Sequence, residues 1–240
     1  MTQAFFWGLC AGSFLLLGGW LAYHFALSRS VIAVVMALGS GVLIGSVVYE
    51  LIDEALKTES VGRVGVFFLV GAAAFAVGDH LVSRGGGSDR KDPTGKQGEG
   101  SPVAIVLGSV LDGIPESFVL GLTVLQGGVS VPLLAGIALS NLPEALSSSS
   151  GLKVAGWPSR RVYAMWSAIT VVSGVSAALG FALLDPASGL TGALVQAFAG
   201  GALLAMVCDE LLPEAYAVEG VLTGVLVVAG LSISLMLDAL

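Results

Sequence analysis

Two short motifs place carboxylates inside otherwise apolar stretches of this chain. One reads GSVLDGIPE and ends at Glu116, and the other reads GIALSNLPE and ends at Glu144. Asp112 and Glu116 are four residues apart and so share one face of a helix, and Ser140 and Glu144 repeat that spacing. A carboxylate at the centre of a membrane helix costs roughly 2.5–3.5 kcal/mol. A cation shared among Asp112, Glu116 and Glu144 would offset that cost.

Each motif also places a proline directly before its glutamate. Pro115 and Pro143 have no backbone N–H, so the carbonyls of Leu111 and Leu139 lose their usual helical donor. Carbonyl and carboxylate oxygens are ligands for a hard cation. Two other interpretations stay open. The acids could be protonated and hydrogen-bonded to neighbouring helices, or they could relay protons without a metal.

The composition requires a lipid environment for the elements that hold these motifs. Hydrophobic residues make up 55% of the 240 residues and charged residues 11%, against roughly 25% charged in a soluble domain. The mean hydropathy is +0.93. A chain of this length cannot bury so much apolar surface in a single core. The acidic pI of about 4.7 reflects carboxylates within apolar segments, and it argues against nucleic acid as a partner.

A membrane span needs about 20 predominantly apolar residues. That rule predicts a single all-α transmembrane domain over residues 1–240 with eight spans, at 4–27, 31–56, 61–83, 102–125, 131–152, 162–184, 191–217 and 219–240. Residues 84–101 read RGGGSDRKDPTGKQGEGS, which predicts a flexible loop. Closely spaced Gly and Ala in most spans predict tight helix packing.

Basic residues predict the orientation, because they collect on the cytoplasmic side. Of the ten Lys and Arg residues, only Lys57 and Arg63 fall on one side of the predicted spans. The other side holds Arg29, Arg84, Arg90, Lys91, Lys96, Lys153, Arg160 and Arg161. Both termini should therefore face the outside of the plasma (cytoplasmic) membrane, and the loop at 84–101 should face the cytoplasm. His24 and His80 end spans on that side and are expected at the interface.

The chain contains two internal repeats. The two Pro-Glu motifs match at an offset of 28 residues. The second span, GVLIGSVVYELIDEA from Gly41, matches the seventh span, GALLAMVCDELLPEA from Gly201, at an offset of 160. By the predicted orientation the members of each pair run in opposite directions. Inverted repeats with interrupted helices are typical of secondary transporters.

Further acids lie nearer the ends of the second and seventh spans. Glu50, Asp53 and Glu54 fall in the outer half of the membrane, and Asp209, Glu210 and Glu214 fall in the inner half. Ser148 extends the stripe of Ser140 and Glu144 toward the cytoplasm. One interpretation is a pathway with outer access, a central site and an inner exit. The other is acids at helix ends that are solvated at the interface.

These residues resemble the ZIP (Zrt/Irt-like protein) family of divalent metal transporters, as a divergent prokaryotic-type member. The resemblance covers the eight spans, and FAGGALLAMVCDELLPEA is similar to the family's seventh span. It implies a bundle with three-plus-two-plus-three inverted symmetry. It also implies transport of Zn²⁺, Mn²⁺, Fe²⁺ or a related ion toward the cytoplasm, through a binuclear site in the fourth and fifth spans.

The chain departs from the family pattern at the site itself. Where family members usually have His-Asn before Pro-Glu, Asp112 and Gly113 stand in the fourth span, and Ser140 and Asn141 in the fifth. The sixth span carries Ser173-Gly-Val-Ser176 and no acid. The expected ligands are Asp112, Glu116, Ser140, Asn141 and Glu144. All are oxygen donors, which favours a harder cation than Zn²⁺.

Transport of a divalent cation (Zn²⁺, Mn²⁺, Fe²⁺ or Mg²⁺) as substrate, without any cofactor, is the function that the sequence favours. The alternative is a ZIP-like membrane protein that binds metal as a sensor or scaffold without transporting it. The chain has no HExxH motif, Ser-His-Asp set or phosphate-binding loop, so an enzyme is not expected. The expected partners are the lipid bilayer and the metal ion. The sequence leaves open whether two chains form a homodimer.

Overall fold

The computed structural model describes residues 1–84, 102–182 and 192–239, and within these residues all regular secondary structure is helical. Most of the expected loop, residues 85–101, lies outside the described part, as do Arg90, Lys91 and Lys96. The helices are α1 (Thr2–His24), α2 (Arg29–Ser46), the π-helix η1 (Val47–Ile52), α3 (Asp53–Thr58), α4 (Val61–Val82), α5 (Pro102–Gln126), α6 (Val131–Val154), α7 (Ser159–Ala182), α8 (Gly192–Met206), the π-helix η4 (Val207–Leu211), α9 (Leu212–Glu219) and α10 (Leu222–Asp238).

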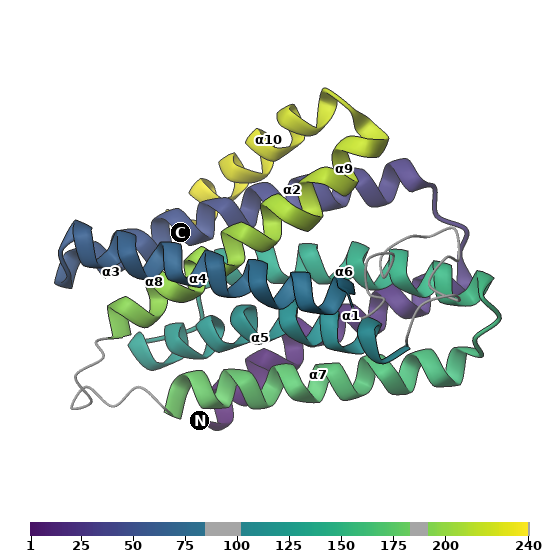
Figure 1. Ribbon diagram of the computed structural model, residues 1–240, viewed down its shortest axis with the longest axis horizontal. Coiled ribbons are helices and arrows are strands. Elements are labelled where there is room, and N and C mark those ends of the chain that lie inside the picture. Colours follow the sequence, from purple (N-terminus) through teal and green to yellow (C-terminus); the bar gives the residue numbers. More distant parts are fainter. Residues whose placement is uncertain (85–101, 183–191, 240) are drawn as a thin grey trace.

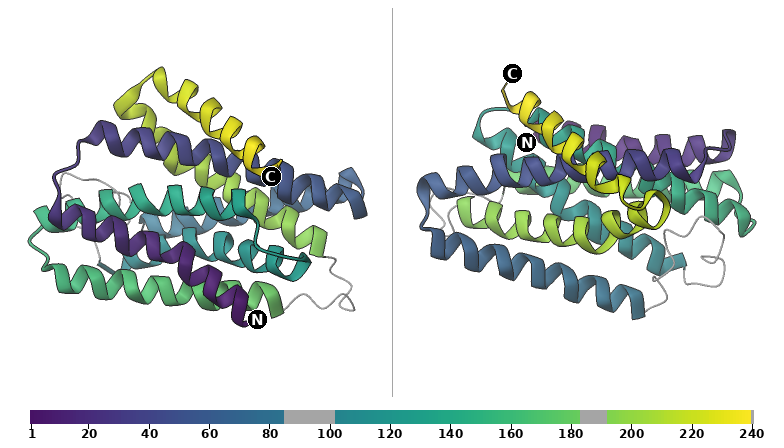
Figure 2. Two further views of the ribbon diagram at one scale, coloured as in Figure 1. Left: turned by 180° about the vertical axis from the view of Figure 1, so that it is seen from behind. Right: turned by 90° about the horizontal axis from the view of Figure 1, so that it is seen from above.

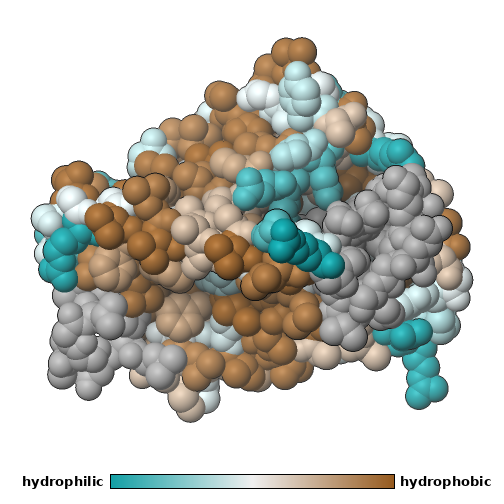
Figure 3. Space-filling view, in the orientation of Figure 1, coloured by the Kyte–Doolittle hydropathy of each residue, from teal (hydrophilic) through white to brown (hydrophobic). Residues whose placement is uncertain are grey.

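The long helices lie side by side in one bundle, and successive helices run in opposite directions (Figures 1 and 2). Both termini lie at the same end, which we call the N/C end; it also holds the turns at residues 59–60 and 127–130. The opposite end, the far end, holds the turns at residues 25–28, 155–158 and 220–221. Hydrophobic side chains cover much of the side of the bundle (Figure 3). That surface is what a lipid environment would cover.

Six of the described helical segments are long and apolar enough to cross a membrane, so this is a multi-pass membrane protein. They are Thr2–His24, Arg29–Thr58, Val61–Val82, Val106–Leu125, Ser159–Ala182 and Gly192–Glu219. The two remaining expected spans also form helices, but they do not have both properties. Val131–Val154 has 24 residues and is rich in polar side chains, and the apolar Leu222–Asp238 has only 17.

The polar character of α6 has a structural cause. Ser140, Asn141, Glu144 and the serines that follow are buried, because α6 packs against α1 on one side and α2 on another. At 1.5 Å per residue its 24 residues extend about 36 Å, and the 17 residues of α10 extend about 25 Å. A helix enclosed by other helices does not need an apolar surface of its own. The low hydropathy of α6 is therefore compatible with a central place in the bundle.

Glycines set the closest approaches between helices. A Cβ atom on Gly71 of α4 would lie 1.8 Å from the Phe198 carbonyl oxygen of α8, and one on Gly201 of α8 would lie 1.9 Å from that of Phe68 in α4. The same reciprocal arrangement joins two other helix pairs, α2 with α10 through Gly41 and Gly230, and α5 with α7 through Gly121 and Gly180. Only glycine allows backbones to approach this closely.

Candidate cation site between α5 and α6

Three carboxylates lie buried near the middle of two long helices. Asp112 and Glu116 of α5 are each 2% exposed, and Glu144 of α6 is 4% exposed. The four-residue spacing of Asp112 and Glu116 follows from the helical repeat that the sequence predicts. The sequence therefore located the buried acids correctly within their helices.

A hydrogen bond joins the two motifs across the helix pair. Ser140 Oγ lies 3.0 Å from Glu116 Oε1, and it is also 3.0 Å from the carbonyl oxygen of Ile137 one turn earlier. Ser140 is 1% exposed, so the contact is shielded from bulk solvent. This bond fixes one oxygen of Glu116 against α6 and brings two of the five expected ligands together.

Glu144 presents an oxygen to the interior without a donor. Its Oε1 atom is fully buried and has no hydrogen-bond partner within the described part of the chain. A carboxylate oxygen away from water and without a donor is costly. A bound cation is one way to offset that cost, so Glu144 is the strongest single indication of a cation site here.

Asn141 is oriented by a helix outside the motif pair. Its Nδ2 atom donates to the carbonyl oxygen of Ala11 in α1, at 3.1 Å. Because that bond uses the amide nitrogen, the amide oxygen is the end that can act as a ligand. Asn141 is 5% exposed, so α1 holds it in place inside the bundle.

One of the two carbonyls freed by proline faces another helix. The Leu139 carbonyl oxygen, which Pro143 leaves without its helical donor, packs against α2; a Cβ atom on Gly39 would lie 2.8 Å from it. The Leu139 carbonyl oxygen therefore lies at the interface between α6 and α2 in this structure. Close contact with a glycine Cα is a recurrent environment for such an oxygen at a helix–helix interface.

The α7 helix supplies hydroxyl groups that the sequence analysis did not include in the site. Ser176 Oγ donates to the carbonyl oxygen of Ile114 at 2.9 Å, directly before Pro115. A Cβ atom on Gly113 would lie 3.6 Å from Ser173 Oγ, in ordinary contact. The sequence signal for these contacts is the pair of serines three residues apart, Ser173 and Ser176, in the sixth predicted span.

The outer acids line a pocket at the N/C end. Glu50, Asp53 and Glu54 lie in η1 and α3, and the pocket has a volume of about 470 Å³. Its other lining residues come from the ends of α5, α6 and α10: Thr123, Gly127, Gly128, Val129, Ser130 and Asp238, with Tyr49 and Lys57 beside the acids. Lys57 Nζ lies 2.7 Å from Glu54 and 3.8 Å from Asp53. The structure thus brings together the three acids that the sequence assigned to outer access.

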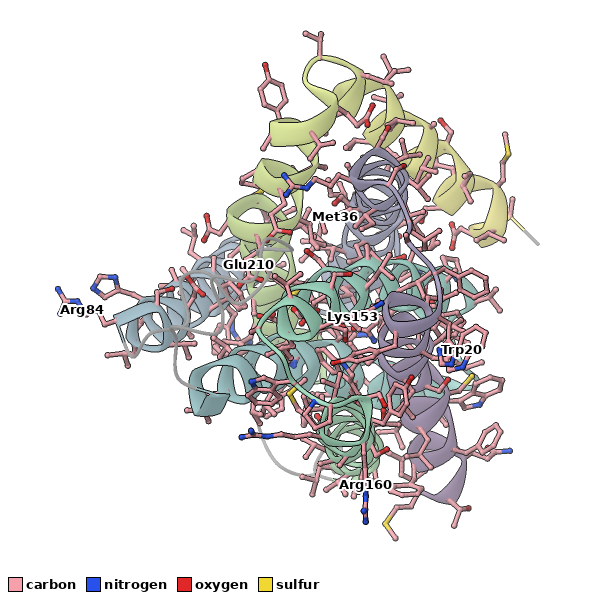
Figure 4. All side chains as sticks on the ribbon, turned by 90° about the vertical axis from the view of Figure 1, so that its right-hand side faces the viewer. Trp20, Met36, Arg84, Lys153, Arg160 and Glu210 are labelled. Atoms are coloured by element: carbon pink, nitrogen blue, oxygen red, sulfur yellow. The ribbon has the colours of Figure 1, made fainter. Side chains whose placement is uncertain are left out.

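The inner acids are more dispersed. Glu210 in η4 is 8% exposed, whereas Asp209 is exposed and Glu214 of α9 is half-buried. Figure 4, viewed from the far end, shows Glu210 within the bundle near α2, while Arg84 and Arg160 point outward. Ser148 of α6 is 1% exposed. These residues lie beyond the central site, toward the far end, without forming one pocket that the structure defines.

The three central carboxylates do not converge as a set of direct ligands. Within residues 1–84, 102–182 and 192–239, no three His, Cys, Asp or Glu side chains form a group that could hold a metal ion. What the structure assembles is a mixed oxygen site: a Ser–Glu pair, an oriented Asn and a Glu with an open oxygen.

No protein-family model matches this chain, and a search of curated proteins finds no match either.

Proposed function

We propose that the protein carries a divalent metal cation across the membrane through the site between α5 and α6. The observation that chiefly supports this is the fully buried Glu144 Oε1 atom without a donor, in the helix that also carries the Ser140–Glu116 bond. Ionisable residues inside membrane helices face a bundle interior and mark ion pathways. The ion is the substrate, with Zn²⁺, Mn²⁺, Fe²⁺ and Mg²⁺ as candidates, and the proposal includes neither a cofactor nor an enzymatic step.

The proposed arrangement is eight spans with inverted repeats. The two π-helices support it, since η1 begins at Val47 and η4 at Val207, which is the offset of 160 residues between the second and seventh spans. The glycine contacts support it too. Gly41 of α2 and Gly201 of α8 are 160 residues apart. Gly41 packs against the backbone of α10 and Gly201 against that of α4, and in both pairs a glycine of the partner helix packs back in the same way. π-Helices also occur frequently at functional sites.

The proposed orientation places the far end in the cytoplasm. Five basic residues that the structure describes belong to helix ends at the far end, namely Arg29, Arg84, Lys153, Arg160 and Arg161. The N/C end has Lys57 and Arg63. Basic residues favour the cytoplasmic side, so both termini would lie outside the plasma membrane.

Together these features support membership of the ZIP family, with its three-plus-two-plus-three arrangement. The path would begin at the pocket lined by Glu50, pass Glu144, and leave past Ser148 and Glu210. Movement toward the cytoplasm follows from the proposed orientation. A second candidate function, metal binding by a sensor or scaffold, is favoured by the missing family histidines at Asp112 and Ser140. Whether two chains pair as a homodimer does not alter either proposal.

Uptake into proteoliposomes tests the proposal directly. Glu144→Gln keeps the shape of the side chain and removes its charge, so we expect uptake of divalent ions to fall by about tenfold or more, since a charged ligand is lost from a buried site. Glu219→Gln, which changes an acid at the far end that bonds Ser30, is the matched control and should transport normally. Wild-type protein that binds metal in detergent but gives no uptake above empty liposomes would favour the sensor or scaffold.

A further inference from the structure

The side chains around the central site offer oxygen and no other donor. Asp112, Glu116, Ser140, Asn141 and Glu144 are all at least nine-tenths buried. Both histidines lie outside this group: His24 ends α1 and His80 lies near the end of α4, and both are exposed. Cys208 in η4 is exposed as well, and Cys10 of α1 is only half-buried, unlike the five site residues. The chemistry available at the site is therefore that of carboxylate, hydroxyl and amide oxygen.

Two contacts make this oxygen character a property of the fold. The bond from Asn141 Nδ2 to Ala11 occupies the amide nitrogen, so rotation of the amide to present nitrogen would lose a buried hydrogen bond. The bond between Ser140 and Glu116 holds one carboxylate oxygen at 3.0 Å from a hydroxyl, which fixes the direction in which the carboxylate points. Asn141 and Glu116 are thus oriented before any ion arrives.

The neighbouring wall adds only oxygen donors. Ser173 of α7 stands beside Gly113, and Ser176 of α7 donates to the Ile114 carbonyl. Gly113 contributes no side chain, so α7 and α5 meet here through hydroxyls and backbone. The site and its wall, as far as the described residues form them, contain no imidazole ring for a borderline-soft ion.

We propose that the central site selects a hard divalent cation of the Mn²⁺ and Mg²⁺ class over Zn²⁺ and binds it through oxygen alone. Imidazole and thiolate ligands favour Zn²⁺, whereas carboxylate, carbonyl and water ligands favour Mg²⁺, Ca²⁺ and Mn²⁺. Mg²⁺ in particular keeps several waters and is usually bound through only one or two carboxylates. Glu144 with its open oxygen, and Glu116 held by Ser140, supply that number. The inference depends on the proposed function in one respect: transport supplies the route by which the ion reaches this buried site.

Manganese binding to the purified protein in detergent tests the inference without any need for transport. Free aqueous Mn²⁺ has a strong electron paramagnetic resonance signal that is lost on binding, so titration gives affinity, and Zn²⁺ or Mg²⁺ can be added as competitor. At most protein sites Zn²⁺ binds more tightly than Mn²⁺, so a preference for Mn²⁺ has to come from the oxygen ligands and geometry of this site. We expect Zn²⁺ to displace Mn²⁺ less effectively than Mn²⁺ competes with itself. Pulsed measurements on bound Mn²⁺ should show water protons and no coupling to a directly bound nitrogen. Zn²⁺ that competes better than Mn²⁺, or a strong nitrogen coupling, would overturn the inference.

Variants separate the central site from the surface. Glu144→Gln should abolish the bound fraction, and a double variant with His24→Gln and His80→Gln should retain it, because those histidines lie outside the site. Asn141→His introduces an imidazole and should bring both a nitrogen coupling and tighter Zn²⁺ competition. Asn141→Asp loses the donor to Ala11 but keeps an oxygen ligand, so it should keep the preference for Mn²⁺; a shift toward Zn²⁺ in this variant would contradict the inference.

The same protein in liposomes distinguishes the two proposals. Selective Mn²⁺ binding without uptake would remove the transport function and leave the oxygen-ligand site standing. Uptake that depends on Glu144 but prefers Zn²⁺ would leave transport standing and remove the selectivity. A wild-type protein that binds no Mn²⁺ in detergent overturns the selectivity whatever the uptake shows.

Discussion

Several polar side chains inside this bundle donate hydrogen bonds to the backbone of another helix. Asn141 of α6 donates to Ala11 of α1, and Thr170 of α7 donates to Gly12 of the same helix at 2.9 Å. Ser176 of α7 donates to the carbonyl oxygen of Ile114 in α5. Between membrane helices such bonds average about 0.6 kcal/mol and reach about 1.7 kcal/mol. Individually they are modest, but together they fix the rotation of the helices that present the candidate ligands.

At the residue scale, Trp166 offers a test of this bonding. Its indole Nε1 donates to Ser149 Oγ of α6 at 2.8 Å, and the side chain is fully buried. Trp166→Phe removes the bond and part of the packing, so we expect the free energy of unfolding to fall by about 1–3 kcal/mol. Thermal or denaturant unfolding in detergent measures it.

Trp20→Phe is the control for Trp166, because Trp20 is 43% exposed. It should change stability by less than about 0.5 kcal/mol. Equal losses for the two substitutions would show that the Trp166–Ser149 contact does not hold α6 and α7 together.

At the scale of elements, α6 shows how far a helix can depart from the usual membrane composition. It carries Asn141, Glu144, Lys153 and a run of serines, yet most of its residues are buried. Lys153 near its end reaches the carbonyls of Ala22 and Tyr23, at 3.1 and 3.2 Å, and so caps the end of α1. Its neighbours, rather than lipid, surround it, so most of its polar groups find their partners inside the protein.

The approach of α4 to α8 gives a prediction at this scale. A Cβ atom at Gly201 would lie 1.9 Å from the Phe68 carbonyl oxygen, and this clash can be removed only if the two helices move apart. Gly201→Val should therefore cost more than about 3 kcal/mol, beyond ordinary overpacking. Size-exclusion chromatography after detergent extraction should show a much smaller folded peak.

Gly224→Val is the matched control, since nothing lies within 4 Å of a Cβ atom at Gly224. This substitution exchanges glycine for valine within another membrane-facing helix, so it should leave the folded peak near the wild-type level. If both variants behave alike, the close approach of α4 and α8 does not limit stability.

At the scale of the whole molecule, polar groups are distributed differently at the two ends of the bundle and along its side. The side is largely hydrophobic in Figure 3, and a hydrophilic patch lies over η4 and α9, where Asp209 is exposed. Lys57 and Arg63 pair with acids close to them in sequence at the N/C end, with Nζ–Oε2 and Nη1–Oε2 distances of 2.7 Å to Glu54 and Glu59. That pairing neutralises the cations at the end proposed to face outward.

Cysteine labelling tests the orientation of the whole molecule. In a background with Cys10→Ser and Cys208→Ser, a cysteine introduced at Ser60 lies in an exposed turn at the N/C end, and one at Arg160 lies at the far end. A membrane-impermeant maleimide applied to intact cells should label the Ser60→Cys protein. The Arg160→Cys protein should react only after permeabilisation. The opposite pattern would reverse the proposed orientation and with it the direction of uptake.

Local sequence patterns determined the class of protein and the places of its helices. Hydropathy located the apolar helices because each must match lipid along its own length, and the prolines and acids marked α5 and α6 because buried charge is rare. Asp112, Glu116 and Glu144 stand out in the sequence for this reason alone. The sequence predicted a span at 131–152 and α6 forms there, but α6 is not among the six helices that are apolar enough to span, since its polar residues face other helices and not lipid.

Only the tertiary structure decided which helix faces meet. It placed Ser140 on Glu116, turned the nitrogen of Asn141 to Ala11, and directed the Leu139 carbonyl toward Gly39. It also gathered Glu50, Asp53 and Glu54 around one pocket with the ends of α5 and α6. Lipid tails are as apolar as a protein core, so hydropathy cannot distinguish a lipid-facing side from a helix-facing one. Those contacts depend on close packing between residues far apart in the chain, and a pattern read along one helix does not contain them.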